Sequence, residues 1–187
     1  MLNTNNFRCV GGIKMEIIKI EDLSFSYSTQ EKKALKKVNL IIEEGDFIVV
    51  CGKSGCGKST LLRHFKTPLT PHGSRQGNIL YKGQVLEYVD NRTQASEIGF
   101  VLQDPEGQIV TDKVWHELAF GLESLGYDNE TIRLKVSEMA SYFGIQEWFM
   151  REVTELSGGQ KQILNLASIM AMNPKVLVLD EPTSQLR

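Results

Sequence analysis

"FIVVCGKSGCGKSTLL", residues 47–62, is the stretch that decides the fold of this chain. Five apolar residues open it, and a helix-like run follows its glycine-rich centre. That centre, Gly52–Thr60, has the spacing G-x-x-x-x-G-K-[S/T]. Glycines there let successive backbone N–H groups turn inward around an anion, which the N-terminus of a following helix also attracts. The stretch therefore predicts a strand buried on both faces of a mostly parallel sheet, then a phosphate-binding loop, then a helix.

The residues of this loop have separate predicted tasks. We expect all of them to surround the phosphates of a nucleotide: Gly52, Lys53, Ser54, Gly55, Cys56, Gly57, Lys58, Ser59 and Thr60. The ammonium of Lys58 would reach the β- and γ-phosphates, and the hydroxyl of Ser59 would ligate Mg²⁺. A chance glycine-rich turn is the alternative, which the strand and helix on either side disfavour. Cys56 is interpreted as a small filler residue without a redox role.

A second apolar strand, "VLVLDEP" (residues 176–182), ends in two carboxylates, and we predict that it too is buried. Open α/β sheets place their ligand chemistry at such strand ends. Asp180 can hold Mg²⁺ directly or through water. Glu181 can orient and deprotonate the water that attacks a γ-phosphate. An apolar strand ending in Asp-Glu is common by itself, but together with the phosphate loop it predicts nucleotide hydrolysis.

The segment "LSGGQ", residues 156–160, opens a predicted helix. Ser157, Gly158, Gly159 and Gln160 would lie at its N-terminus, which makes the segment a second anion-binding element. One nucleotide does not need two such cradles from one chain. The economical interpretation is that this element serves the nucleotide of a partner.

Composition and length narrow the class of protein. The 187 residues suffice for one domain with an inserted subdomain. A net charge of −2 disfavours a large nucleic-acid footprint, so we expect no nucleic-acid partner. No apolar run approaches the roughly 18 residues of a membrane span, and the three cysteines lack CxxC spacing. We therefore expect a cytoplasmic protein that works at a membrane only as a peripheral subunit.

Hydrophobic periodicity predicts an α/β fold. Strands are expected over residues 15–28 and on both sides of a turn at Glu44-Gly45, and helical spacing covers residues 113–125, 130–143 and 160–172. Residues 1–14 are Asn-rich and aperiodic, and we interpret them as a disordered N-terminal extension. His64, His72 and His116 share no metal-ligand spacing, so they are expected to be packed or solvated.

Over residues 15–187 the order and spacing of these motifs resemble the ATP-binding cassette (ABC) ATPases. The resemblance implies a P-loop NTPase (RecA-like) core of mostly parallel strands, an N-terminal antiparallel β part, a helical subdomain near residues 105–155, and ATP and Mg²⁺ as cofactors. Gln103 matches the family's Q-loop glutamine, which senses Mg²⁺, takes part in catalysis and contacts the membrane partner. Tyr27 matches the aromatic residue that stacks on adenine; a strand aromatic in the core is its alternative.

Residues 103–126, "QDPEGQIVTDKVWHELAFGLESLG", resemble the energy-coupling-factor (ECF) branch, especially the first half of a tandem cassette. That branch implies ATP-driven uptake of a vitamin or metal ion, with a second ABC domain and a transmembrane subunit as partners. Another importer or exporter cassette and a soluble non-transport ABC protein are the alternatives. The same segment also reads as an amphipathic helix with a core stripe of Val114, Leu118, Leu122 and Leu125.

The chain departs from the family pattern at its C-terminal end. Arg187 occupies the position of the family's D-loop aspartate, and the family's later switch histidine has no counterpart. We therefore expect a C-terminally truncated cassette that lacks part of its core. Loss of a group positioned at the γ-phosphate costs about 10²–10⁴-fold in rate, so turnover by this chain alone is expected to be weak or absent. A non-catalytic MgATP-binding fragment is the alternative.

Overall fold

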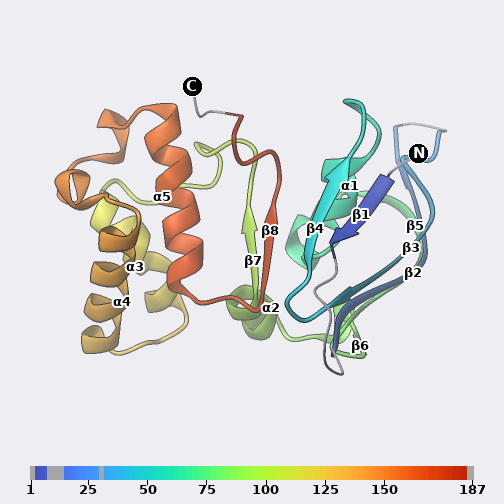
Figure 1. The fold of residues 1–187 in the computed structure, drawn as a ribbon, viewed down its shortest axis with the longest axis horizontal. Helices are drawn as coiled ribbons and strands as arrows, with labels where there is room; N and C mark the ends of the chain where they lie inside the picture. Colours follow the sequence, from blue (N-terminus) through green and yellow to red (C-terminus); the bar gives the residue numbers. More distant parts are fainter. Residues whose placement is uncertain (1–2, 8–14, 30–31, 185–187) are drawn as a thin grey trace. The chain divides into compact units, whose positions relative to one another are not determined.

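The computed structural model describes residues 3–7, 15–29 and 32–184. The chain forms two compact units, Met1–Asp90 and Asn91–Arg187, each with its own elements (Figure 1). The α/β class predicted from the sequence is confirmed. None of the helices in the described ranges is long and apolar enough to cross a bilayer.

An antiparallel sheet forms most of the first unit, in the order β3-β2-β5-β6. These strands are β2 (Glu16–Tyr27), β3 (Leu35–Glu43), β5 (Gly73–Tyr81) and β6 (Gln84–Val85). Apolar residues alternate along β2, and Ile18, Ile20 and Phe25 are almost completely buried. An irregularity between Ile20 and Leu23 interrupts this alternation, and Ile17 and Ser24 are buried as well. The strand predicted over residues 15–28 is therefore confirmed, but its half-exposed pattern is not.

The strand before the phosphate loop is β4 (Phe47–Cys51), and the short helix α1 (Lys58–Arg63) follows the loop. β4 pairs antiparallel with β1 (Asn3–Phe7). The prediction that β4 is buried on both faces is wrong, because Phe47 is 71% and Val49 38% exposed. Among the described strands β4 pairs only with β1, so it lacks the parallel neighbours that would cover it.

Residues 3–7 of the extension predicted to be disordered form β1, whereas residues 1–2 and 8–14 lie outside the described ranges. Two 3-10 turns, Thr67–Leu69 and Leu86–Tyr88, complete the described part of this unit.

The second unit joins a helical layer to a pair of parallel strands. Its elements are α2 (Asn91–Glu97), β7 (Ile98–Val101), α3 (Val114–Ser124), α4 (Asn129–Tyr142), 3-10 turns at Gln146–Trp148 and Val153–Glu155, α5 (Gly158–Ala171) and β8 (Val176–Leu179). The three predicted helices are confirmed, with ends shifted by one or two residues. In Figure 1, α5 lies between the α3–α4 pair and the strands β7 and β8.

Packing among α3, α4 and α5 builds the core of this unit. Val114, Leu118 and Leu122 are fully buried and Leu125 is 8% exposed, which confirms the predicted stripe. α5 ends where Asn173 adopts a left-handed conformation (φ 55°) directly before Pro174. The helix end predicted at Asn173-Pro174 is therefore confirmed.

β7 and β8 pair in parallel, from Ile98 opposite Val176 to Val101 opposite Leu179. All four residues of β7 are buried, because α5 packs against this strand. The prediction that β8 is buried is only half right. Val178 is 5% exposed, but Leu177 and Leu179 on its other face are 39% and 37% exposed. No strand in the described ranges covers that face.

Candidate functional site

The glycine-rich loop after β4 has the backbone that its sequence predicts. Gly55 and Gly57 adopt positive φ angles of +75° and +102°, which other residues rarely reach. A Cβ atom on Gly57 would lie 2.8 Å from the carbonyl oxygen of Ala34, so a larger residue does not fit there. The N–H of Cys56 donates to the carbonyl of Lys53 (3.2 Å), which closes the turn. The loop is therefore an exposed turn whose glycines are required by geometry.

Lys58 folds back over this loop. Its Nζ donates to the carbonyl oxygens of Gly52 (3.0 Å) and Lys53 (3.3 Å). An ammonium held at the mouth of the loop is correctly charged to meet an anion there. Ser59, the next residue, is half-buried in the first turn of α1, where its hydroxyl oxygen is a suitable hard donor for Mg²⁺.

Tyr27 lies next to the helix that follows the loop. Its hydroxyl and that of Thr60 are 2.8 Å apart and share a hydrogen bond. The Tyr27 ring is half-buried and meets the edge of Phe25, with centroids 5.0 Å apart. The structure thus brings Tyr27 to the phosphate loop, while its role towards adenine stays a prediction.

His64, at the C-terminal end of α1, is packed as predicted. Its ring is fully buried against Phe25, and Nδ1 donates to the carbonyl of Thr60 at 2.6 Å. Burial lowers the pKa of His64 below its ordinary value, and this effect outweighs the hydrogen bond to Thr60. His72 is exposed, and Nε2 of His116 lies 3.5 Å from Glu123. The described residues contain no cluster of three or more His, Cys, Asp or Glu side chains with the geometry of a metal site.

In the second unit, the predicted catalytic side chains meet at the ends of two strands. Nε2 of Gln103 donates to Oε2 of Glu181 at 2.8 Å. Because β7 and β8 are parallel, the residues that follow them lie at the same edge. The N–H of Asp180 extends the strand pairing to Val101 (3.0 Å), and its carboxylate is 1% exposed.

Glu181 differs from Asp180 in both exposure and backbone. Its side chain is exposed, and its φ of 49° places it in the left-handed region that favours glycine. Unusual backbone conformations of this kind cluster at functional sites, because the surroundings hold the side chain in one direction. The carboxylate and amide oxygens of Asp180 and Gln103 are donors that a hard cation such as Mg²⁺ accepts.

Gln108 is a contributor that the sequence analysis missed. Its Oε1 accepts from the N–H of Leu102 and its Nε2 donates to the carbonyl of Phe100, both at 2.8 Å. One side chain thereby satisfies two backbone groups of the β7 edge and closes the turn that begins at Gln103. A glutamine in a loop carries no periodic signal, so nothing in the sequence distinguishes it.

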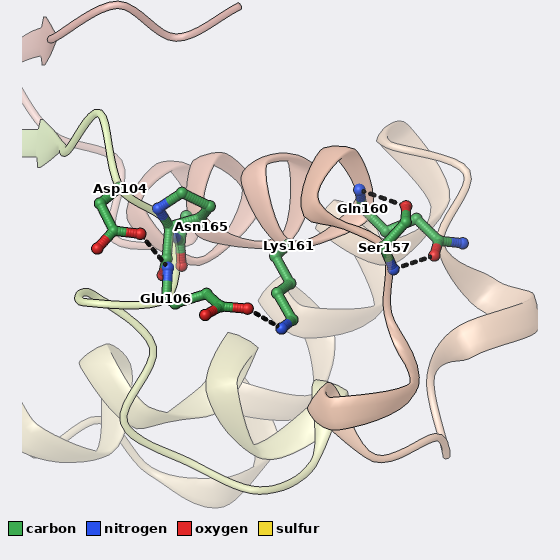
Figure 2. Close-up of polar contacts among 7 residues, drawn as sticks. Asp104, Glu106, Ser157, Gln160, Lys161 and Asn165 are labelled. Atoms are coloured by element: carbon green, nitrogen blue, oxygen red, sulfur yellow. Dashed lines mark hydrogen bonds and ion pairs between the residues drawn. The ribbon is translucent and has the colours of Figure 1, made fainter. Parts of the chain in front are cut away.

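The segment Leu156–Gln160 begins α5 with a capping box, which Figure 2 shows. The N–H of Gln160 donates to Oγ of Ser157 (3.3 Å), and the N–H of Ser157 donates to Oε1 of Gln160 (2.9 Å). Gly158 and Gly159 occupy the first two helical positions, whose N–H groups lack partners within a helix. The predicted helix start is confirmed, and its exposed donors are suited to an anion.

Comparison with known proteins agrees with this geometry. The sequence profile of the ABC transporter family matches residues 35–184. A Bacillus anthracis protein named as an ABC transporter ATP-binding protein is 47% identical over 168 residues, which are 90% of this chain and 30% of that protein. The structure of cbiO1 from Clostridium perfringens, part of the ABC transporter complex cbiONQ, superposes with a TM-score of 0.75 at 32% identity and covers 92% of this chain and 68% of that one.

A second solved structure is similar: the dimeric, post-hydrolysis ATP-binding cassette MJ0796 bound to ADP and phosphate. It has a TM-score of 0.77 at 25% identity and covers 91% of this chain and 76% of that one. Position 187, where the family's D-loop aspartate was sought, lies outside the described residues. The chain spans less than a third of the length of the Bacillus relative. Since the family profile matches well over half of its residues, the chain belongs to the ABC transporter family.

Proposed function

We propose that this chain is the ATP-binding part of an ABC transporter and couples the binding and hydrolysis of MgATP to transport across a membrane. The observation that carries the proposal is the loop Gly52–Thr60, whose glycines adopt the required backbone and whose Lys58 ammonium lies over the loop. Family membership supports ATP as the nucleotide. The loop amides and Lys58 would hold the phosphates, and Tyr27 would stack on adenine.

Hydrolysis would depend on Glu181, Gln103 and Asp180. Glu181 would accept a proton from the attacking water, and the amide of Gln103, now 2.8 Å from Glu181, would hold that water and the carboxylate in line. Mg²⁺ bound by Ser59, Gln103 and Asp180 would offset the charge that develops on the phosphates.

The partners follow from the family and from the second anion-binding element. Ser157–Gln160 would contact the nucleotide of a second ABC domain, in a homodimer, a heterodimer or a tandem chain. The dimeric MJ0796 structure supports such pairing, and the length of the Bacillus relative leaves room for a second cassette. We propose that the cassette starts at residue 15 and that residues 105–155 form its helical subdomain.

The similarity to cbiO1, part of the complex cbiONQ, favours an ECF-type role in the uptake of a vitamin or metal ion. In that role the segment after Gln103 would contact a transmembrane subunit, and the protein would lie at the cytoplasmic face of the membrane. We propose that the whole assembly hydrolyses ATP, whereas turnover by this chain alone is expected to be weak or absent.

Nucleotide binding is tested first, by thermal unfolding of the chain with and without MgATP. Ligand at 100 times its Kd stabilises a protein by about 2.7 kcal/mol, so a clear rise of Tm is expected. Lys58→Ala should abolish that rise. Lys36→Ala, which removes an exposed lysine on β3 of the same unit, should keep it. A rise that persists in Lys58→Ala would show that the phosphate loop is assigned wrongly.

Hydrolysis is tested separately, by phosphate release with a second cassette supplied. Glu181→Gln should keep the MgATP-induced rise of Tm while phosphate release falls by about 10²–10⁴-fold. Equal release by the variant and the original chain would remove Glu181 from the mechanism.

A further inference from the structure

The turn that begins at Gln103 is fastened to α5 at two points (Figure 2). Nδ2 of Asn165 donates to the carbonyl of Pro105 at 3.0 Å. One turn of α5 earlier, Nζ of Lys161 pairs with Oε1 of Glu106 at 2.5 Å. These contacts join residues that are 60 and 55 positions apart in the sequence. The turn therefore lies along α5 and not against solvent alone.

The two attachment points share a face of α5 with the start of the LSGGQ helix. Ser157, Lys161 and Asn165 are spaced by four residues, so their side chains follow one another along the same side. The N–H of Lys161 donates to the carbonyl of Ser157 at 2.9 Å, which makes this stretch regular helix. A displacement applied at Lys161 or Asn165 therefore reaches Ser157 with little loss, because a helix resists stretching and bending over two turns.

The other end of the turn is equally fixed. Gln103 contacts Glu181, and Gln108 clamps the turn to the β7 edge through two hydrogen bonds. The carbonyl of Pro105 also accepts from the N–H of Gln108 (3.2 Å), so the atom that binds Asn165 belongs to the same closed ring of contacts. A shift of Gln103 cannot be absorbed within so short a turn without moving Glu106 or Pro105.

The two contacts differ in strength. Asn165 is fully buried, so breaking its bond to Pro105 would leave the buried amide donor Nδ2 unsatisfied, which is costly. The side chain of Glu106 is 70% exposed and that of Lys161 15%, so their pair is a surface contact of small net energy. The hydrogen bond from Lys161 and its positive charge lower the pKa of Glu106.

We propose that Glu106, Lys161 and Asn165 are positioning residues that link the nucleotide sensor Gln103 to Ser157, and so link a chain's own nucleotide to the one its LSGGQ element contacts. This inference rests on the proposed function. Asn165 anchors the turn to α5, and the Glu106–Lys161 pair sets the position of the first turn of the helix. Coupling between two binding sites is reciprocal. If the nucleotide at Gln103 changes the affinity of Ser157 for the partner's nucleotide by some factor, the partner's nucleotide changes the affinity at Gln103 by that same factor.

The test is hydrogen exchange of the backbone amides, with the chain dilute enough to be monomeric by sedimentation. In the original chain, saturating MgATP should slow exchange both in residues 103–108 and in residues 157–162. Glu106→Gln and Lys161→Met should each reduce the slowing in residues 157–162 by roughly 2–5-fold, the range of a surface ion pair. The charge swap Glu106→Lys with Lys161→Glu should restore it.

Lys135→Met is the matched control. Its Nζ also contacts α5, but at the carbonyl of Ala171 (3.4 Å), at the far end of the helix from Ser157. It should leave the slowing in residues 157–162 unchanged. Unfolding without nucleotide is measured for every variant, so that a fold defect is recognised, and Asn165→Leu should give the largest loss of stability.

Each outcome separates the two proposals. No MgATP-induced rise of Tm in the original chain would reject the proposed function, and this inference with it. Binding that slows exchange in residues 103–108 but not in 157–162 would overturn the inference alone. The inference would also be overturned if both single variants kept the full slowing of exchange in residues 157–162. It would be overturned too if the charge swap did not restore the slowing that the single variants lose.

Discussion

Phe25 organises the surroundings of the phosphate loop at the scale of single residues. It is buried, and its ring makes edge contacts with the rings of Tyr27 and His64. Both neighbours then bond to Thr60, Tyr27 through its hydroxyl and His64 through Nδ1. Thr60, the third residue of α1, is thus hydrogen-bonded by both side chains that pack against Phe25, which holds the first turn of the helix in place.

His64 should make the stability of the chain depend on pH. Its Nδ1 donates to Thr60, and its Nε2 is buried without a partner among the described residues, so the charged ring is disfavoured. The pKa of His64 in the folded chain is therefore below the ordinary 6.5, and burial is the largest cause of this lowering. Arg75 lowers it further, whereas the Thr60 carbonyl and Glu87 oppose the shift. Below about pH 6.5 the unfolded chain binds a proton that the folded chain refuses, so stability falls as pH falls.

Urea unfolding between pH 7.5 and pH 5 measures this effect. We expect His64→Leu to flatten the fall in unfolding free energy, even if the variant is less stable throughout. His72→Gln, at an exposed position, should leave the slope nearly unchanged. Equal slopes for His64→Leu and the original chain would mean that His64 does not cause the dependence.

At the scale of elements, Glu117 of α3 binds the loop that precedes the helix. It lies in the first turns of α3 and is 5% exposed. Its Oε2 accepts from the N–H of Val110 (3.2 Å), the N–H of Thr111 (2.9 Å) and the hydroxyl of Thr111 (2.9 Å). One buried carboxylate oxygen therefore fixes the end of the segment that starts at Gln103 to the helical layer.

Glu117→Ala should destabilise the chain, because three donors lose their acceptor. Leaving a buried group unsatisfied costs about 1–3 kcal/mol, so the fall in unfolding free energy should reach at least that range. Glu123→Ala, on the same helix but with a half-exposed side chain, should cost less than about 0.5 kcal/mol. Equal losses in the two variants, measured by urea unfolding, would show that the contacts of Glu117 add nothing.

The same elements show what a sequence can and cannot predict. The phosphate loop, the three helices and the capping segment were predictable, because spacing over a few residues fixes them. The burial of β4 and β8 was not, since it depends on which strands lie beside them and their composition is the same either way. Nor was the contact of Asn165 with Pro105, because 60 residues separate the two and an asparagine within a helix carries no pattern of its own.

Exposed apolar strand faces are the main feature at the scale of the whole molecule. In the first unit Phe47 and Val49 of β4 are exposed, and in the second unit Leu177 and Leu179 of β8 are. Apolar side chains on uncovered strands favour association with other copies. We therefore expect the chain to aggregate at concentrations and temperatures at which both units are still folded.

Phe47→Ala should reduce this aggregation without lowering stability. The side chain is 71% exposed, so its removal deletes an adhesive surface and leaves no cavity, and the unfolding free energy should change by less than about 0.5 kcal/mol. Phe25→Ala is the matched control, because that ring is 1% exposed and its loss should cost about 3–5 kcal/mol. Light scattering during slow heating, combined with urea unfolding, separates the two effects. If Phe47→Ala lowered stability as much as Phe25→Ala, Phe47 would be part of a buried core, and the exposed face of β4 could not be the cause of aggregation.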